Sequence, residues 1–332
     1  MKEGRNNGNA ILVRTSERQS FLTCRQKWYW SYVERLRSPT TDPKLLFGDL
    51  VHQSLALYYK PGRKRGPHPA RTFERLSEKL ADETAISLWA DDEILDFTEL
   101  GVGMLERYVE HWIEQDKEFR ILSSEQTFQL PIGRLNGKRV WYVGTIDGVW
   151  EHMPSTKIRF LETKTTTAIS DSALPMDEQV GAYWTYGPRW LRNKGILKSG
   201  ERLDGILYNW LRKALPSEGD YDEQGRKLNK NGEVSKRQPA PFFARNNTFR
   251  GDFEAERVKQ RVWQEVKDME AARGNPELVY KNPGPSFFPN CKFCSFRDMC
   301  ELHETGNDWV SMLKSETQVW DPYAEHEVYD GR

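Results

Sequence analysis

Four cysteines, placed at two distant points of the chain, constrain the fold of this sequence more than any other feature. One stands near the N-terminus and three form a C-x2-C-x5-C cluster close to the C-terminus: Cys24, Cys291, Cys294 and Cys300. Four thiolates are a complete ligand set for an iron–sulfur cluster or a zinc ion. We therefore expect one metal centre to join the two ends of the chain, so that the residues between them form a single closed unit.

The composition describes a soluble chain with a real core and no membrane segment. Hydrophobic residues make up 37% of the 332 residues, and charged residues make up 30%. No run of about eighteen apolar residues occurs, and residues 1–9 are polar and lack a signal-peptide core. We expect a cytoplasmic protein with no membrane partner. Two disulfides in a secreted protein are the alternative use of four cysteines, and the missing export signal and the close C-terminal spacing argue against it.

The charges are segregated along the chain although they cancel overall, with 49 basic and 49 acidic residues. From Glu301 onward eight acidic residues face two basic ones, which gives this tail a net charge of −6 and the first 300 residues +6. One basic stretch without an acid lies in a segment rich in proline and glycine: Lys60, Arg63, Lys64, Arg65 and Arg71. Such a stretch is either a solvated loop or a surface that contacts phosphates.

The hydrophobic pattern predicts helices first and then a sheet. We expect helices at about 16–36, either continuous or broken near Cys24, and at about 45–59, 72–90 and 97–116. Residues rich in Val, Ile, Trp, Tyr and Phe predict strands at 121–131, 138–150, 157–164 and 203–211, with a helix at about 175–193 before the last strand and another at about 252–273. The expected fold class is therefore α/β, with a mixed sheet flanked by helices.

This order of elements suggests four regions. They are an N-terminal helical region at 1–120, a sheet-containing core at 121–280, a cysteine segment at 281–302 and an acidic tail at 303–332. Within the core, the polar stretch 215–241 predicts an extended hairpin or mobile loop beside the sheet. From residue 226 onward its basic residues are opposed only by Glu233; they are Arg226, Lys227, Lys230, Lys236 and Arg237.

Two of the predicted strands carry residues suited to metal-assisted hydrolysis. Gly144 and Asp147 lie on one strand, and Glu162 and Lys164 lie on the next. Residues i and i+2 of a strand share a face, so Glu162 and Lys164 point the same way while Thr163 points away. Two carboxylates can hold Mg²⁺ or Mn²⁺ near a phosphodiester, and an ammonium can orient water and offset developing charge. The alternative for an isolated E-x-K tripeptide is an ordinary ion pair on the surface of a strand.

Two further pairs recur at helical spacing. Gln179 and Tyr183 are four residues apart on a predicted helix and so share a face, as do Gly48 and His52 on an earlier helix. A neutral imidazole at His52 could complete the ligands of a metal ion, and glycine allows close approach. Taken singly, His52 is equally explained as a core or cap histidine, and Tyr183 as a core aromatic residue.

Taken together, these motifs resemble a known family. The ordered set G-x-x-x-H, G-x-x-D, E-x-K and Q-x-x-x-Y is similar to the RecB-like branch of the PD-(D/E)xK nucleases, which have a restriction-endonuclease-like core. The flanking cysteines resemble the iron–sulfur staple of a subset of that branch, which includes CRISPR-associated adaptation nucleases, phage relatives and the nuclease domain of a bacterial helicase–nuclease subunit. The resemblance covers about residues 16–302.

The resemblance implies a role for each matching residue. His52, Asp147 and Glu162 would bind Mg²⁺ or Mn²⁺ with the backbone carbonyl of Thr163, and Lys164 would position or activate water. Gln179 and Tyr183 would contact Lys164, the substrate backbone or both. Glu125, on the strand before Asp147, would either support the metal ligands or be a simple surface acid. For the four cysteines, the resemblance favours a 4Fe-4S cluster over zinc.

The expected activity is that of a metal-dependent deoxyribonuclease. The resemblance favours an exonuclease acting on single-stranded DNA or duplex ends in recombination, repair or phage DNA processing. A different hypothesis is a DNA-end-binding module whose catalytic site is weak, working beside a helicase, a recombinase or a CRISPR adaptation complex. No G-x-x-x-x-G-K-[ST] motif is present, so the sequence encodes no ATP-binding loop of that type. The sequence leaves a homo-oligomer open.

Overall fold

A six-stranded mixed sheet forms the centre of the protein. The computed structural model describes residues 10–39, 42–81, 91–216, 221–222, 226–238, 240–286 and 289–324. Within these residues the sheet has the strand order β1-β4-β5-β6-β7, with β3 paired to the other edge of β4. The strands are β1 (Ala10–Val13), β3 (Phe119–Leu135), β4 (Lys138–His152), β5 (Lys157–Thr166), β6 (Ile206–Arg212) and β7 (Phe243–Thr248).

The sheet forks along β4. Its first half pairs in parallel with β1 over Arg139 to Tyr142, and its last residues, from Gly148 to His152, pair in antiparallel register with β5. Between these two stretches the same edge of β4 has no strand partner among the described residues, while β3 continues along the opposite edge. Asp147 lies in this unpaired stretch of β4, and the candidate site forms there.

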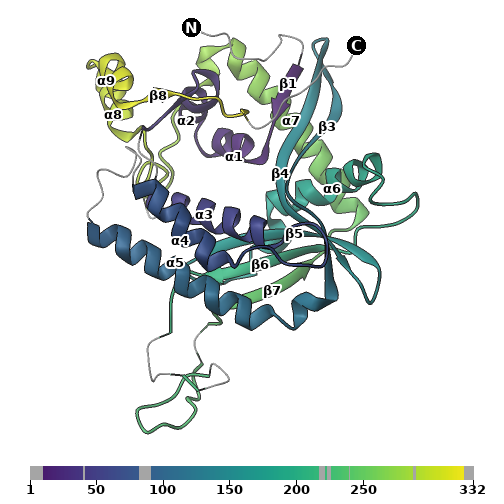
Figure 1. Cartoon of the computed structure of the whole chain (residues 1–332). Helices are drawn as coiled ribbons and strands as arrows, with labels where there is room; N and C mark the ends of the chain where they lie inside the picture. The colour runs from purple at the N-terminus through teal and green to yellow at the C-terminus, as the bar shows by residue number, and fades with distance from the viewer. Residues whose placement is uncertain are drawn as a thin grey trace.

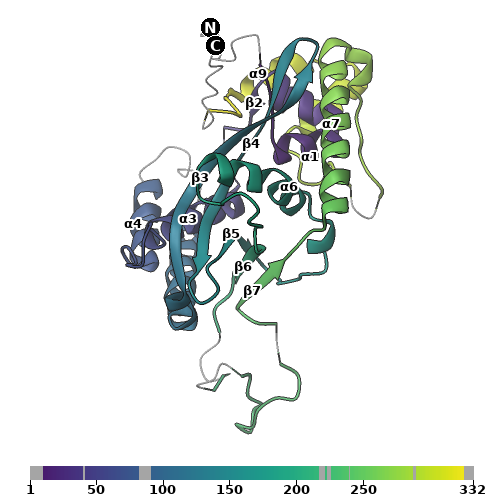
Figure 2. The same ribbon diagram turned by 90° about the vertical axis from the view of Figure 1, so that its right-hand side faces the viewer.

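Helices cover both faces of the sheet, as the views in Figures 1 and 2 show. One face packs against α3 (Pro43–Tyr58), α4 (Pro69–Ala81) and α5 (Asp91–Trp112). The other packs against α1 (Thr15–Thr23), α6 (Glu178–Asn193) and α7 (Asp252–Gly274). Successive side chains of β5 point to opposite faces of the sheet, which explains this division. Phe160 joins the core beneath α6, while Leu161 joins the core beneath α3. The expected α/β class, a mixed sheet flanked by helices, agrees with this arrangement.

The helix starts follow from local chemistry. Pro43 occupies the first turn of α3, and the side chain of Asp42 accepts a hydrogen bond from the backbone N–H of Lys44. Asp177 caps α6 in the same way by accepting from the N–H of Val180. The predicted helix at 72–90 is confirmed as far as Ala81, and residues 82–90 lie outside the described residues.

The predicted helix at 16–36 is interrupted, as expected, at Cys24. The chain is extended there, with φ −160° and ψ 115°, and then continues as α2 (Arg25–Trp28) and a π-helical turn (Tyr29–Val33). The prediction of continuous helix beyond residue 33 was wrong, because residues Leu36–Arg37 form the short strand β2.

The two ends of the described chain contact each other directly. β2 pairs with β8 (Gln318–Val319), the guanidinium of Arg14 donates to the carbonyl of Pro322 at 2.7 Å, and the hydroxyl of Tyr323 contacts the buried carboxylate of Glu17. Of the acidic tail expected at 303–332, the structure describes residues 303–324. This part of the chain carries the end of α8 (Arg297–Thr305) and α9 (Trp309–Glu316), whose apolar residues pack against Trp30. The strands β1 and β7 were missed, since both are too short for a pattern to be read.

A buried ionic network joins α5 and its following turn to β6 and β7. Arg245 of β7 pairs with Asp116 at 2.6 Å, and both side chains are almost fully buried. The same guanidinium donates to the hydroxyls of Tyr59 and Tyr108 and to the side chain of Asn209. Asn209 in turn donates to the hydroxyl of Thr163 at 3.3 Å. The network therefore supports the strand that carries the candidate site.

Breaking this network should destabilise the protein strongly. Asp116→Asn keeps the shape of the side chain but leaves the buried Arg245 charge without its partner, which costs about 3 kcal/mol or more. Urea denaturation should record this loss. Lys117→Ala removes the neighbouring exposed pair with Glu114 and should cost less than about 1 kcal/mol. Equal losses in the two variants would contradict this account.

Candidate active site

Asp147 lies at the fork of the sheet and connects its two sides. One carboxylate oxygen accepts a hydrogen bond from the backbone N–H of Thr163 at 2.6 Å. The other lies 3.3 Å from Nδ1 of His52 on α3. The N–H of Thr163 is available because β4 and β5 pair only from Gly148 onward. One carboxylate thus joins a helix from one face of the sheet to the strand that carries Glu162 and Lys164.

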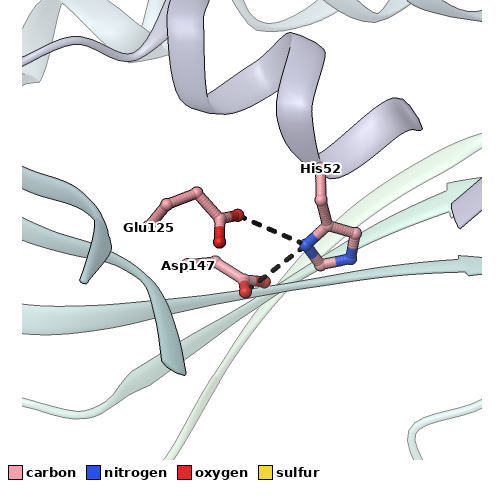
Figure 3. A group of neighbouring side chains, drawn as sticks. All are labelled: His52, Glu125 and Asp147. Carbon is pink, nitrogen blue, oxygen red and sulfur yellow. Dashed lines mark ion pairs between the residues drawn. The ribbon is translucent and has the colours of Figure 1, made fainter. Parts of the chain in front are cut away.

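Figure 3 shows His52, Glu125 and Asp147 pointing toward one another. An oxygen of Glu125 lies 3.8 Å from Nδ1 of His52. Ligand atoms from the three residues all lie within 4.8 Å of one another, and this is the one such group of His, Cys, Asp or Glu side chains among the described residues. The chemistry of the group, one imidazole nitrogen and carboxylate oxygens, suits a divalent cation such as Mg²⁺ or Mn²⁺.

Glu162 and Lys164 point to the α6 face of β5 and contact each other. The ammonium of Lys164 lies 2.6 Å from one oxygen of Glu162, whose side chain is almost fully buried. The other oxygen of Glu162 is buried and has no hydrogen-bond partner. A buried carboxylate oxygen without a donor is costly, so its position is consistent with a metal ligand.

Gln179 and Tyr183 extend this chain of contacts from α6 to β4. Lys164 donates to the amide oxygen of Gln179 at 3.0 Å, and the amide nitrogen of Gln179 donates to the hydroxyl of Tyr183 at 2.8 Å. Tyr183 then donates to the carbonyl of Thr145 at 2.6 Å. Every donor in the series has an acceptor, which fixes the ammonium of Lys164 beside Glu162.

The protonation states follow from burial and from the neighbouring charges. Burial raises the pKa of the Glu162 carboxyl to about 7, although Lys164 lowers it. Burial alone would lower the pKa of His52, but the Asp147 and Glu125 carboxylates outweigh it and hold the pKa well above its ordinary value. Burial also acts to lower the pKa of Lys164, and Glu162 outweighs it, so that the pKa is raised. Lys164 is therefore an ammonium at neutral pH, which suits it to orient water rather than to remove a proton.

Glu125 is the residue whose place the sequence left undecided. The structure puts its carboxylate beside His52, so it is not an isolated surface acid. Its backbone has φ +43°, a conformation that a glutamate rarely adopts. Its flanking residues Ser124 and Gln126 pair with Gly148 and Ile146, so the distortion lies opposite Asp147. Strain of this kind gathers at functional sites, and no signal in the sequence indicated it.

The glycines of the motifs have packing roles. A Cβ atom at Gly144 would lie 2.8 Å from the ring of Phe128, so this position admits no side chain without displacing that ring. Gly48, one turn before His52, faces the hydroxyl of Thr165 at contact distance. The turn of α3 that precedes His52 therefore lies against the end of β5.

The four cysteines gather around one cavity at the junction of the chain ends. All four are free thiols, partly buried, and line a cavity of about 470 Å³ together with Lys27, Trp30 and Lys281. A single zinc ion with bonds of about 2.3 Å brings its sulfurs to about 3.8 Å from one another. In the described part of the chain no three cysteine sulfurs are that close, since the one compact group of ligands contains no cysteine.

Comparison with known families agrees with this geometry. A family model described as the PD-(D/E)XK nuclease superfamily matches residues 15–301. The chain belongs to the PD-(D/E)XK nuclease superfamily. The protein is accordingly a metal-dependent nuclease whose substrate is DNA. No curated protein matches the sequence significantly. None of the described helices is long and apolar enough to cross a membrane.

A divalent cation should stabilise this nuclease through the candidate site. Adding Mn²⁺ at about a hundred times its dissociation constant stabilises the folded state by about 2.7 kcal/mol, and we expect the melting temperature to rise by several degrees. Asp147→Ala should remove this rise, because Asp147 contributes the central carboxylate. Glu316→Ala, at an exposed carboxylate of α9, serves as the control and should retain it. A rise of the same size in Asp147→Ala would show that the ion binds elsewhere.

Proposed function

We propose that this nuclease belongs to the RecB-like branch and acts as an exonuclease on single-stranded DNA or duplex ends. The observation that carries the proposal is the convergence of His52, Asp147, Glu162 and Lys164 from three separate elements at the fork of the sheet. The same order of residues led to the resemblance with that branch. Roles in recombination, repair or phage DNA processing, beside a helicase, recombinase or CRISPR adaptation partner, follow from the resemblance alone.

The proposed metal ligands are His52, Asp147, Glu162 and the carbonyl of Thr163, with Glu125 as an added carboxylate. Among these, His52, Asp147 and Glu125 form the compact group of ligand atoms, whereas Glu162 lies outside that group and has one buried oxygen without a hydrogen-bond partner. Imidazole and carboxylate donors of this kind fit Mg²⁺ or Mn²⁺. When bound, such an ion polarises the scissile phosphate and lowers the pKa of water. No strand of the described residues pairs with this edge of β4 beside Asp147, so the end of a DNA strand would approach the carboxylates without displacing a paired strand.

Lys164 would act through its charge. Its ammonium is held by Glu162 and Gln179, and an ammonium has three protons to donate, so one remains for water or for a phosphate oxygen. Charge that develops on the phosphate is best stabilised by donors already in place, because no reorganisation is then needed. Gln179 and Tyr183 position Lys164 through the series of hydrogen bonds that ends at Thr145.

For the cysteines we propose a 4Fe-4S cluster. A cluster places several iron and sulfide atoms between its four thiolates, so it needs a cavity and wider sulfur spacing than a zinc ion does. The cavity lined by Cys24, Cys291, Cys294 and Cys300 supports this proposal. Because Tyr323 and β8 already hold the chain ends together, the cluster would reinforce a junction rather than form it alone.

Cleavage assays test the catalytic assignment. With Mn²⁺ the protein should shorten linear DNA from its ends and leave circular DNA intact. Lys164→Ala should lower the rate by about 10² to 10³-fold, because a preorganised donor is lost. Lys157→Ala, at the exposed opposite end of the same strand, should leave the rate unchanged. Full activity in Lys164→Ala would remove our assignment, and tight binding without cleavage would favour a DNA-end-binding module.

Anaerobic purification tests the cysteine centre. The purified protein should be brown, absorb light at about 400 nm and contain about four iron atoms per chain. Cys24→Ala should lose most of the iron, because that thiolate is the ligand from the N-terminal side. If the protein is colourless and holds one zinc ion tightly, the cysteines form a zinc site and not a cluster. If it holds neither metal, the proposed metal centre is excluded.

A further inference from the structure

The segment between β6 and β7 forms a basic arm, defined here by its described residues 226–238. Figures 1 and 2 both show this part of the chain projecting away from the sheet and its helices. Bridges between Tyr221 and Lys227 and between Leu228 and Val234 give it the character of a narrow hairpin. Of the segment 215–241, expected to be an extended hairpin or mobile loop, residues 217–220, 223–225 and 239 lie outside the described residues.

The base of the arm is fixed to the body of the protein. The N–H of Arg212 donates to the carbonyl of Phe242 at 2.8 Å, so the chain leaves and re-enters the sheet at one point. The ring of Tyr221 packs against Phe242, with centroids 5.8 Å apart, and Leu215 contacts Gly103 of α5. The arm therefore has a defined origin, although no core residue holds its tip.

The arm carries exposed positive charge without matching acids. Five exposed cations lie on it. Arg226 pairs with Asp222 at 2.7 Å. The other four form no ion pair within the described part of the chain; they are Lys227, Lys230, Lys236 and Arg237. The one described acid of the arm is Glu233, which accepts a hydrogen bond from the amide of Asn231. Like charges held this close repel one another, so the arrangement is stabilised by a polyanion.

The base of the arm lies close to the candidate active site. Arg212 pairs in register with Thr166, two residues beyond Lys164 on β5. The N–H of Lys213 donates to the carbonyl of Thr166 at 2.7 Å, and its ammonium lies 5.8 Å from the ring centroid of Phe47 on α3. Positive charge therefore begins at the carboxyl end of the strand that carries the E-x-K residues.

Lys44 lies three residues before Phe47 on α3, and Lys213 lies over the ring of Phe47, so a second cation is near Lys213. Burial and the nearby Lys44 lower the pKa of Lys213, and together they outweigh the attraction of Asp42. Lys44 is exposed at the start of α3, on the same helix as Gly48 and His52. Neither Lys44 nor Lys213 forms an ion pair within the described residues. The two cations therefore extend the positive charge from the arm toward the fork.

We infer that Lys44, Lys213 and the basic arm form a track that binds the phosphate backbone of the DNA strand entering the fork. The inference rests on the proposed nuclease function and goes beyond it, because it assigns substrate binding to a segment outside the motifs. The track contacts phosphates and reads no bases, so it raises affinity for any sequence and makes that affinity depend on salt.

Binding measured against salt concentration tests the track. The probe is a fluorescein-labelled thirty-nucleotide oligothymidylate, and all variants carry Lys164→Ala so that the probe stays intact. The arm variant replaces Lys227, Lys230, Lys236 and Arg237 by Gln. The slope of log affinity against log salt should decrease by about 2 to 3, since each neutralised phosphate of a single strand contributes about 0.7. Affinity near physiological salt should fall about tenfold or more.

A matched variant separates the track from net charge. It replaces four other exposed lysines, at the amino end of β5, beyond α6 and on α7, by Gln: Lys157, Lys194, Lys198 and Lys267. It loses the same formal charge and should keep the parental slope. Equal decreases in both variants, or an unchanged slope in the arm variant, would overturn the inference. The second outcome would instead point to an acidic protein as the partner of the arm.

Kinetics with Lys164 restored distinguish this inference from the nuclease proposal. The arm variant should show a raised KM and an unchanged kcat, because the arm does not touch the metal ligands. A kcat reduced as much as kcat/KM would contradict a role limited to binding. Parent protein that shows the slope but never cleaves would support the track while excluding the proposed activity, so the two failures are separable.

Discussion

The carboxylate of Asp147 is the point through which the parts of the site are joined. It lies on an edge of β4 that neither β1 nor β5 pairs with, and it accepts the Thr163 N–H while facing His52. A backbone N–H near the end of a strand would otherwise need a ladder partner or water. Satisfying it with a side chain lets the two strands diverge. The fork and the site are therefore one feature of the structure.

Three residues from the two faces of β5 lie at this fork. Thr163 points to the side of α3 and is held by Asn209, while Glu162 and Lys164 point to the side of α6. Burial of Glu162 beside Asp147 concentrates negative charge, and the ammonium of Lys164 and the imidazole of His52 offset part of it. A bound divalent cation would neutralise the negative charge that remains. The same ion would thus serve both the stability of the site and its chemistry.

The two ends of the described chain meet through ordinary packing, beside the cavity that the four cysteines line. Tyr323, Arg14 and the β2–β8 pair bring the ends together in a region that α8 and α9 cover. A metal centre there would add stability to an interface that already exists. The basic arm is built differently, because only its base is packed, and its charges face solvent where a large substrate can reach them.

The amino-acid sequence by itself determined most of the order of helices and strands, the α/β class and the spacing of the motif residues, because periodicity and short-range spacing are local properties. It offered six candidate site residues through that spacing and through the family that the motifs resemble: His52, Asp147, Glu162, Lys164, Gln179 and Tyr183. The strained Glu125, the short strands β1 and β7 and the folding of the acidic tail could not be predicted. Each depends on partners far away in the sequence, such as His52 for Glu125 and β2 for β8. Only the tertiary structure decided where the sheet opens, because that depends on which strands compete for one edge of β4.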